Sequence, residues 1–539
     1  MKKYLIVLLS AISFQTIAQQ KLSRPKLVVG IVVDQMRLDY IYRYYDRLSD
    51  NGFKRMLKEG FSCENTFIRH LPSYTAVGHS TIFTGSVPSI HGITGNNWID
   101  QATGKNVYCT DDSTVQTVGS TSVNGKMSPR NLLASTVTDE LMLATNFQSK
   151  VVGVSLKDRA SILPAGHAAT GAFWFDDASG NFISSTWYMQ QLPEWAQKFN
   201  DDKQPEKLVA KGWDTYYPIN TYKQSTADDV PWEGLFKGEK APVFPHDMAT
   251  FYKQDHDNIR TSPFGNTLTL DFAKAAVNGY GLGTGSATDF LTINCASTDY
   301  VGHKYGPNSI EIEDVYIRLD KDLATFFSFL DTKVGKGNYT VFLSADHGAS
   351  HAIGFMKEHK IPADLVQTKA MLAGLNAVLA KQFGQNDLVL SLTNYYVNFD
   401  MKKVKQQGLD IEALKKASIE YIEVQPGIQY VVDVTKVSES TIPAVLKEKI
   451  INGYNRKRCG LVTFVPEPGW FEGPAKGTTH GTWNAQDVHI PLLFMGWGIK
   501  QGASTQVHYM TDIAPTISAL LHIQMPNGSI GEPITEVQK

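Results

Sequence analysis

The segment P-S-Y-T-A-V-G-H-S-T-I-F-T-G-S-V-P-S-I-H-G-I-T-G-N, from Pro72 to Asn96, predicts a short loop that opens a helix and continues into a turn region rich in glycine and proline. Thr75 stands where the helix begins, and free backbone N–H groups and the helix dipole favour negative charge there. Threonine is also a common N-cap residue. This segment alone therefore leaves Thr75 as either a structural cap or a reactive hydroxyl. Acidic and histidine residues elsewhere in the chain favour the second interpretation.

Several short apolar runs predict the strands of a parallel sheet. Residues 26–34, K-L-V-V-G-I-V-V-D, are almost continuously apolar, which is typical of a strand buried on both faces. Residues 150–156, 289–296 and 339–344 show the same pattern, and helical segments separate these runs. We therefore predict an α/β fold with a central, mostly parallel sheet flanked by helices. Such sheets bind ligands at the carboxyl ends of their strands, and Asp34 lies at one of these ends.

Two segments interrupt the alternation of strands and helices. Residues 171–264 show little periodicity and carry five of the nine tryptophans, among Asp, Pro and Lys residues. Residues 385–470 mix short strands and helices in an α+β pattern. We predict that both segments are insertions that form a cap or rim on a single catalytic domain, residues 19–539.

Residues 1–18 have the pattern of a secretory signal peptide. Lys2 and Lys3 precede an apolar run, and Ala18 supplies a small residue for cleavage. The run is too short to cross a bilayer, and no cysteine stands at the cleavage point to carry a lipid. We therefore predict an exported protein, periplasmic or secreted, with no membrane anchor, and we expect a monomer.

The composition argues against some partners. The chain has 53 acidic and 51 basic residues, so there is no electrostatic basis for binding nucleic acid. The four cysteines are widely spaced and allow three disulfide pairings, among which the sequence does not choose. They are Cys63, Cys109, Cys295 and Cys459. Without clustered cysteine ligands, a cysteine-based zinc site is not expected.

Three aspartates and three histidines are the candidate metal ligands: Asp34, Asp299, His303, Asp346, His347 and His480. Five of them follow predicted strands, and His480 shortly precedes a fourth strand that starts at His489. Because such strand ends converge on one edge of a sheet, we expect the six side chains to lie together. Carboxylates and imidazoles suit zinc better than manganese or iron. Two ions about 4 Å apart are a natural arrangement for phosphoryl transfer.

Each of these motifs also has a structural interpretation. Asp34 alone resembles a helix cap, and Asp346 with His347 resembles a hydrogen-bonded structural pair. Asp299 and His303 are four residues apart, so a helical turn places both on one face. The glycines around His480 do not form the pattern G-x-x-x-x-G-K-[ST], which argues against nucleotide cradling.

Lys157 and Arg159 are the candidate phosphate-binding cations. They follow the strand V-V-G-V-S-L, and their alternation places both on the same side of an extended chain. Two neighbouring cations are costly without an anion that they share. A pair of solvated loop residues is the alternative.

The chain resembles the alkaline phosphatase superfamily, and within it the phosphate-irrepressible PafA-type alkaline phosphatases. The resemblance spans nearly the whole mature chain and rests on the motifs V-V-D-Q-M-R, T-A-V-G-H-S-T-I-F-T-G-S-V-P-S-I-H-G, S-L-K-D-R-A-S-I-L-P-A-G-H, S-T-D-Y-V-G-H, S-A-D-H-G and K-G-T-T-H. It implies an alkaline phosphatase-like fold and an exported enzyme with two zinc ions. The implied reaction is hydrolysis of small-molecule phosphate monoesters through a phosphothreonine intermediate.

The resemblance also implies a role for each site residue. One zinc would be held by Asp299, His303 and His480. The other would be held by Asp34, Asp346 and His347, with the oxygen of Thr75 as a further ligand. Thr75 would be the nucleophile, while Asn96, Lys157 and Arg159 would hold the phosphoryl oxygens.

Two other functions remain open. A nucleotide pyrophosphatase or phosphodiesterase of the same superfamily would share the metals and the nucleophile. We favour a monoesterase because a monoester dianion gains more from two cations than a diester does. An exported phosphate- or sugar-binding protein without turnover is the alternative from another class, but simple capture needs no nucleophile beside two metals. The motif G-x-S-x-G of serine hydrolases and the motif H-E-x-x-H of zinc proteases are absent from the sequence.

Overall fold

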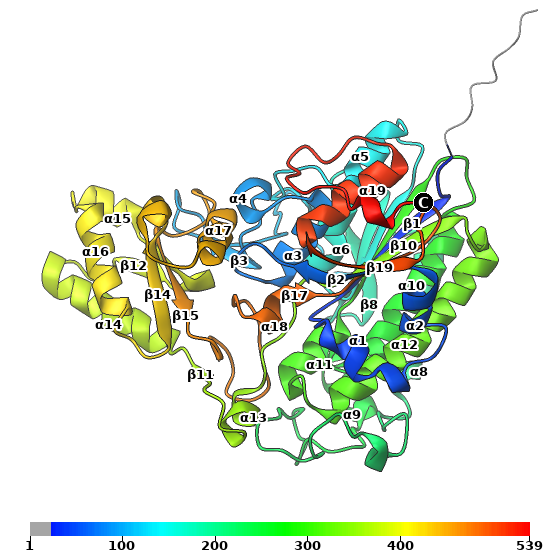
Figure 1. The fold of residues 1–539 in the computed structure, drawn as a ribbon, viewed down its shortest axis with the longest axis horizontal. Helices are drawn as coiled ribbons and strands as arrows, with labels where there is room; N and C mark the ends of the chain where they lie inside the picture. The colour runs from blue at the N-terminus through cyan, green and yellow to red at the C-terminus, as the bar shows by residue number, and fades with distance from the viewer. Residues whose placement is uncertain (1–22) are drawn as a thin grey trace, which may run out of the picture.

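The computed structural model describes residues 23–539, and its central element is an 11-stranded sheet (Figure 1). The five strands in the middle of the sheet are parallel and wholly buried. In spatial order they are β10 (Tyr339–Ser344), β1 (Leu27–Val33), β9 (Asp289–Cys295), β6 (Val151–Ser155) and β7 (Gly171–Asp176). Burial on both faces explains their continuous apolar runs. The prediction of an α/β fold built around a parallel core is confirmed.

The two edges of the sheet are mostly antiparallel. Beyond β7 lie β8 (Asn181–Ser185) and β5 (Thr117–Val118), and beyond β10 lie β18 (Leu492–Gly496), β2 (Phe61–Phe67) and β17 (His489–Ile490). β19 (Gly502–Tyr509) pairs with β2 in parallel. The sheet therefore has five parallel and five antiparallel pairings, so "mostly parallel" describes its centre and not the whole.

The antiparallel strand β18 corrects one step of the sequence argument. A residue before a parallel strand would lie at the opposite edge from the residues that follow the other strands. Ser344, at the end of β10, pairs with Leu492, at the start of β18. The loop before β17 and β18, which carries His480, therefore reaches the same edge as Asp34 and Asp346.

Helices cover both faces of the sheet. One layer contains α3 (Thr75–Thr84), α5 (Val137–Ala144), α6 (Asp158–Ala165) and α19 (Ile513–Leu521). The other contains α2 (Phe53–Glu59), α10 (Pro263–Tyr280), α11 (Ser297–Tyr305) and α12 (Ile310–Leu330) (Figure 1). The short helices α1 (Asp39–Arg43), α4 (Pro88–His91), α13 (Ile353–Glu358) and α18 (Ala485–Val488) lie in connecting segments. The apolar faces of both layers pack on the strands in one large core.

The first predicted insertion is shorter at its start than the sequence indicated. Residues 171–185 form β7 and β8 of the central sheet, because their aromatic side chains pack between the sheet and α10. The remaining part, to residue 264, contains α7 (Glu194–Asp201), α8 (Gln204–Val209) and α9 (Met248–Gln254). It is not an independent unit, since its buried residues, such as Trp213 and Phe251, belong to the main core.

The second predicted insertion contains its own small sheet. The strands β12 (Val389–Ser391), β13 (Tyr396–Phe399), β15 (Val462–Pro466) and β14 (Ile428–Asp433) form it, in that spatial order. The helices α14 (Thr368–Phe383), α15 (Met401–Gln406), α16 (Ile411–Ile422) and α17 (Ala444–Gly453) accompany it. This part, yellow and orange in Figure 1, stands to one side of the central sheet and has an apolar core of its own. It begins at α14, earlier than residue 385.

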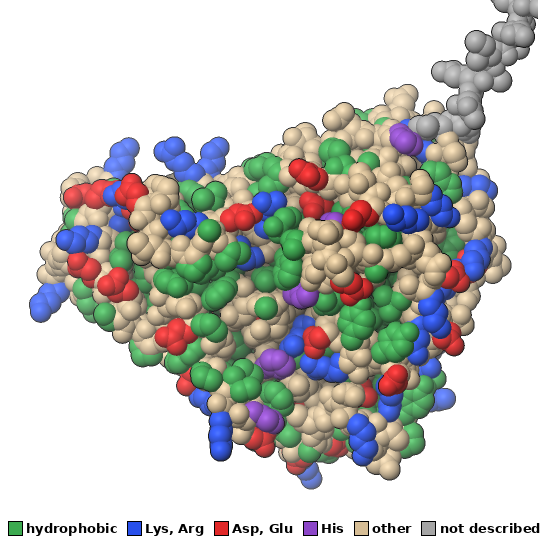
Figure 2. Space-filling view, viewed as in Figure 1, with side chains coloured by type: hydrophobic (Ala, Val, Ile, Leu, Met, Phe, Trp, Pro, Cys, Tyr) green, Lys and Arg blue, Asp and Glu red, His purple; other side chains and the backbone are tan. Residues whose placement is uncertain are grey.

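The remaining sequence predictions concern the signal peptide, membrane spans, cysteines and surface charge. The predicted signal peptide, 1–18, lies outside the described residues. Within residues 23–539, no helix is long and apolar enough to cross a membrane. All four cysteines are buried free thiols. Acidic and basic side chains are interspersed over the face shown in Figure 2.

Candidate active site

Thr75 is the first residue of α3 and not its N-cap. The N-cap is Tyr74, whose side chain makes no capping hydrogen bond within the described chain. The Thr75 hydroxyl is buried and lies 3.5 Å from His347 Nε2 and 3.5 Å from Lys157 Nζ. The structural-cap interpretation of Thr75 is therefore wrong, and the hydroxyl is at the positive end of the helix dipole.

Asp299, His303 and His480 form one group of potential metal ligands. One ligand atom from each lies within 4.8 Å of the others. Asp299 and His303 come from the same face of α11, as the four-residue spacing predicted, and Asp299 Oδ1 is 3.1 Å from His303 Nε2. His480 Nε2 is 3.7 Å from the same oxygen.

Asp34, Asp346 and His347 form a second group with the same spacing. His347 Nε2 lies 3.7 Å from Asp34 Oδ1 and 3.4 Å from Asp346 Oδ2. These two carboxylate oxygens are fully buried, and neither accepts a hydrogen bond from any residue that the structure describes. A buried carboxylate oxygen without a partner is costly. A bound cation would satisfy both.

All three imidazoles are oriented through Nδ1, which faces a backbone carbonyl. His303 Nδ1 is 2.9 Å from Thr478 O, His347 Nδ1 is 2.9 Å from Gly348 O, and His480 Nδ1 is 2.7 Å from Ser73 O. Such a contact keeps the proton on Nδ1 and leaves the Nε2 lone pair for a metal. Each group thus offers carboxylate and imidazole donors of the kind that zinc accepts. The residues present fit a pair of divalent ions.

The electrostatics of the two groups match this donor set. Burial and the neighbouring Asp346 raise the pKa of Asp34 well above its usual value. Burial also lowers the pKa of His480 well below its usual value, and His347 beside it adds to the effect. Burial opposes ionisation of Asp299, but His303 and Lys157 hold its pKa well below the usual range. Burial opposes the charged form of His303, but Asp299 beside it raises the pKa of His303 above its usual value. The site therefore crowds carboxylates and imidazoles together, an arrangement that a divalent cation stabilises.

Lys157 and Arg159 lie at the start of a helix and not, as predicted, on an extended chain. β6 ends at Ser155, Lys157 is the N-cap residue of α6, and Arg159 lies in the first turn of that helix. Lys157 Nζ is 2.9 Å from Asp34 Oδ2 and 2.6 Å from Asp299 Oδ2, so one ammonium touches both ligand groups. Arg159 Nη1 donates to the hydroxyl of Tyr108 at 3.1 Å. Both cations line one cavity of about 230 Å³.

Asn96 is held against the start of α3. Its Oδ1 accepts a hydrogen bond from the backbone N–H of Ala76 at 3.0 Å, in the first turn after Thr75. The side-chain NH2 group thus remains available as a donor near the start of α3. The other nominated residues contact Thr75, the start of α3 or one another within the two ligand groups, and Arg159 shares a cavity with Lys157.

Sequence analysis missed three further residues that contact the site. His79 Nδ1 lies 3.4 Å from Asp346 Oδ2, and Tyr108 binds Arg159. Gln35 contacts two of the aspartates. Gln35 and His79 stand inside the motifs already quoted, so their positions were a signal. Tyr108 stands outside all of them, and only the fold brings it to Arg159.

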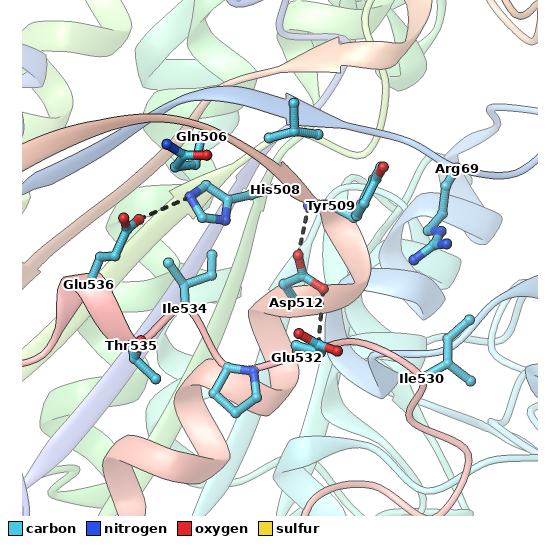
Figure 3. A pocket seen from close by; sticks show the side chains of 12 residues that line it. Arg69, Gln506, His508, Tyr509, Asp512, Ile530, Glu532, Ile534, Thr535 and Glu536 are labelled. Atoms are coloured by element: carbon cyan, nitrogen blue, oxygen red, sulfur yellow. Dashed lines mark hydrogen bonds and ion pairs between the residues drawn. The ribbon is translucent and has the colours of Figure 1, made fainter. Parts of the chain in front are cut away.

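A cavity of about 500 Å³ lies elsewhere, between β19 and the C-terminal segment (Figure 3). His508 and Glu536 face each other across it at 3.4 Å, and Asp512 accepts the N–H groups of Tyr509 and Glu532. None of the nominated site residues lines it. The candidate active site is therefore identified by its side chains and not by cavity size; of the nominated residues, only Lys157 and Arg159 line the 230 Å³ cavity.

Comparisons with known proteins agree with this geometry. The family model for type I phosphodiesterase / nucleotide pyrophosphatase matches residues 28–486. The chain is 56% identical to alkaline phosphatase PafA of Elizabethkingia meningoseptica, over 95% of this chain and 94% of the relative. It is 53% identical to a protein of Myroides odoratus named calcium-transporting ATPase, over 97% and 96% of the two chains.

Solved structures of PafA show the same fold. The crystal structure of wild-type PafA matches with a TM-score of 0.94 over 96% of this chain and 99% of that chain. A second PafA structure carries four substitutions, of a threonine by serine and of an asparagine, a lysine and an arginine by alanine. The chain therefore belongs to the type I phosphodiesterase / nucleotide pyrophosphatase family, and within it to the PafA-type alkaline phosphatases.

Proposed function

We propose that the protein is an exported phosphomonoesterase that hydrolyses small-molecule phosphate monoesters through a phosphothreonine at Thr75. The observation that carries the proposal is the meeting of two buried ligand groups at one helix N-terminus. His347 of one group lies 3.5 Å from the Thr75 hydroxyl, and Lys157 touches both groups and the hydroxyl.

The proposed cofactors are two zinc ions per chain. Asp299, His303 and His480 would hold one, and Asp34, Asp346 and His347 would hold the other, with the Thr75 oxygen as a further donor. When bound, the two ions supply Lewis acidity that makes the threonine alkoxide accessible and stabilises negative charge on the leaving oxygen.

In the first step the Thr75 hydroxyl loses its proton to solvent and its oxygen attacks phosphorus. An Oγ–P bond forms as the ester P–O bond breaks, and the departing oxygen takes the electron pair and later a proton from water. The N-terminus of α3 and the amide of Asn96 stabilise charge on the non-bridging oxygens. Lys157 and Arg159 would do so as cations, and both line one cavity of about 230 Å³.

In the second step water attacks the phosphothreonine. A new O–P bond forms, the Oγ–P bond breaks, and the Thr75 oxygen regains a proton as inorganic phosphate leaves. The same donors bind the non-bridging oxygens in both steps, so the chain needs no second binding mode. Two in-line displacements give overall retention of configuration at phosphorus.

Support for a monoesterase comes from the two cations. A monoester dianion presents two charged oxygens, which Lys157 and Arg159 can meet together. A diester replaces one of them with a second ester group. The four residue types substituted in the PafA variant are those proposed here for Thr75, Asn96, Lys157 and Arg159. The second candidate function, a nucleotide pyrophosphatase or phosphodiesterase, is favoured by the description of the matching family model.

The proposed function also includes the export, oligomeric state and domain organisation of the protein. Residues 1–18 would be a signal peptide that directs the protein to the periplasm or the medium, where it would act as a monomer. Residues 19–539 would be one catalytic domain. The segments around 186–264 and 368–470 would form its rim.

Substitution of Thr75 tests the proposal. Thr75→Ala should abolish turnover of a phosphate monoester while leaving the zinc content near two per chain. Thr75→Ser should keep measurable activity, because it retains a hydroxyl at the same place. A wild-type protein that binds phosphate but turns over neither a monoester nor a methylated diester would instead identify a binding protein. A higher rate on the diester would favour the phosphodiesterase.

A further inference from the structure

Gln35 occupies a strained position between the two ligand groups. It directly follows Asp34 at the end of β1, is buried, and has a φ of 62°. Residues other than glycine rarely adopt this left-handed conformation, and where they do, the surrounding structure imposes it, often at functional sites. The surrounding structure therefore holds Gln35 in this conformation.

Gln35 makes one contact to each ligand group. Its backbone N–H donates to Asp346 Oδ1 at 3.2 Å, and its side-chain Nε2 donates to Asp299 Oδ1 at 2.6 Å. Asp299 Oδ1 is also the oxygen that faces the Nε2 atoms of both histidines in its group. The amide of Gln35 thus fixes the oxygen that points into the first group, while its backbone fixes an aspartate of the second.

Gly302 provides the space for this side chain. A Cβ atom at position 302 would lie 1.9 Å from Gln35 Oε1. Gly302 lies inside α11, where glycine is unfavourable compared with alanine. The missing side chain in α11 is therefore explained by the close approach of the Gln35 amide.

We infer that Gln35 is a positioning residue that orients Asp299 through its side-chain amide and Asp346 through its backbone N–H. The inference rests on the proposed metal sites but not on the proposed nucleophile. A neutral amide suits this place, because a carboxylate at the same distance from Asp299 would repel it. Partners that orient metal ligands typically change metal affinity by about 10- to 100-fold when they are removed.

The positioning role of Gln35 can be tested by measuring zinc affinity, without an activity assay. Gln35→Ala keeps the backbone N–H and the same φ, so it removes only the contact to Asp299. In a zinc titration against a competing chelator, we expect it to weaken one of the two sites by about 10- to 100-fold and to change the other little. The weakened site should be the one that His480→Ala removes. Gln35→Glu should weaken that site at least as much.

Gln101→Ala is the matched control, because the side-chain Nε2 of Gln101 also donates hydrogen bonds, to Ile99 O and Asn398 Oδ1, outside the site. It should leave both zinc affinities unchanged. Equal zinc affinities in wild type and Gln35→Ala would overturn the inference. So would equal weakening of both sites. A failure of the proposed nucleophile would instead appear as an active Thr75→Ala variant, with zinc binding unaltered.

A double-mutant cycle with Gly302 checks the contact by thermal unfolding. Gly302→Ala should lower Tm in the wild-type background, because its Cβ displaces the Gln35 amide. In the Gln35→Ala background the same change should raise Tm or leave it unchanged, since alanine is the better helix residue. The same fall in Tm in both backgrounds would show that Gly302 and Gln35 do not interact, and would contradict the positioning role.

Discussion

The rings of His347 and His480 stack with their centroids 3.4 Å apart and their planes within 11° of each other. Each histidine belongs to a different group of metal ligands. The two groups are therefore in direct contact through these two rings, and ions bound in them would lie close together. This arrangement suits phosphoryl transfer, in which one ion assists the attacking oxygen and the other the leaving oxygen.

Removal of the two cations tests substrate class. We expect the double variant Lys157→Ala/Arg159→Ala to lose about 10³-fold or more in kcat/KM for a phosphate monoester, because each lost donor to developing charge costs about 10²- to 10³-fold. Turnover of a methylated diester should fall far less. The measurement is kcat/KM on both substrates with the same preparation. Equal losses on the two would contradict the dianion argument.

Tyr108 should affect catalysis through Arg159. The Tyr108 hydroxyl donates to Asp158 Oδ1 at 2.8 Å and accepts from Arg159 Nη1 at 3.1 Å, so it holds the guanidinium at the cavity. We expect Tyr108→Phe to lower monoester kcat/KM by about tenfold, the free-energy equivalent of one charge-assisted hydrogen bond. The same change in an Arg159→Ala background should cost little. A similar loss in both backgrounds would assign Tyr108 a role independent of Arg159.

Metal removal should lower both activity and stability. Without ions the second group has two buried carboxylate oxygens, Asp34 Oδ1 and Asp346 Oδ2, that accept no hydrogen bond from the described residues. Zinc that binds only the folded chain adds about 2.7 kcal/mol per site when it is present at 100 times the dissociation constant. A chelator should therefore abolish turnover and lower Tm, and added zinc should restore both. His480→Ala serves as the control, because its Tm should respond less to zinc. A chelated protein with unchanged Tm would argue against the two ligand groups as metal sites.

Buried Glu233, which lies outside the candidate active site, should make the stability of the protein depend on pH. This side chain is buried, and burial together with the neighbouring Glu311 raises its pKa to about 10. The folded chain therefore keeps a proton that the unfolded chain releases near pH 4.5. Stability from this group is full below pH 4.5 and is lost as the pH rises towards 10.

Glu233→Gln should flatten that fall, since the amide remains neutral. The measurement is Tm between pH 6 and pH 9, with exposed Glu206→Gln as the control. An unchanged slope in Glu233→Gln would show that Glu233 does not hold the proton.

The sequence predicted the fold class correctly but not the direction of every strand. Asp34, Asp299 and Asp346 could be nominated because each follows a continuous apolar strand within four residues, and a local pattern suffices for that. The antiparallel direction of β18 could not be read, because strand direction depends on pairing between segments far apart in the chain. For the same reason, the sequence did not show that residues 171–185 belong to the central sheet.

Contacts between distant residues were the other limit. The left-handed φ of Gln35 and its approach to Gly302 follow from the packing of α11 on the end of β1, which no local pattern encodes. Lys157 and Arg159 were nominated by an argument that assumed the wrong local backbone conformation. Their alternation suggested an extended chain, but a helix start places them at the same cavity.

The most direct test of the central claim, that Thr75 forms a covalent phosphoryl intermediate, is the stereochemical course at phosphorus. A phosphate monoester made chiral with oxygen isotopes is turned over in the presence of an alcohol acceptor, and the configuration of the transferred phosphoryl group is determined. Two displacements through Thr75 predict retention of configuration. Inversion would show a single displacement and would contradict the account.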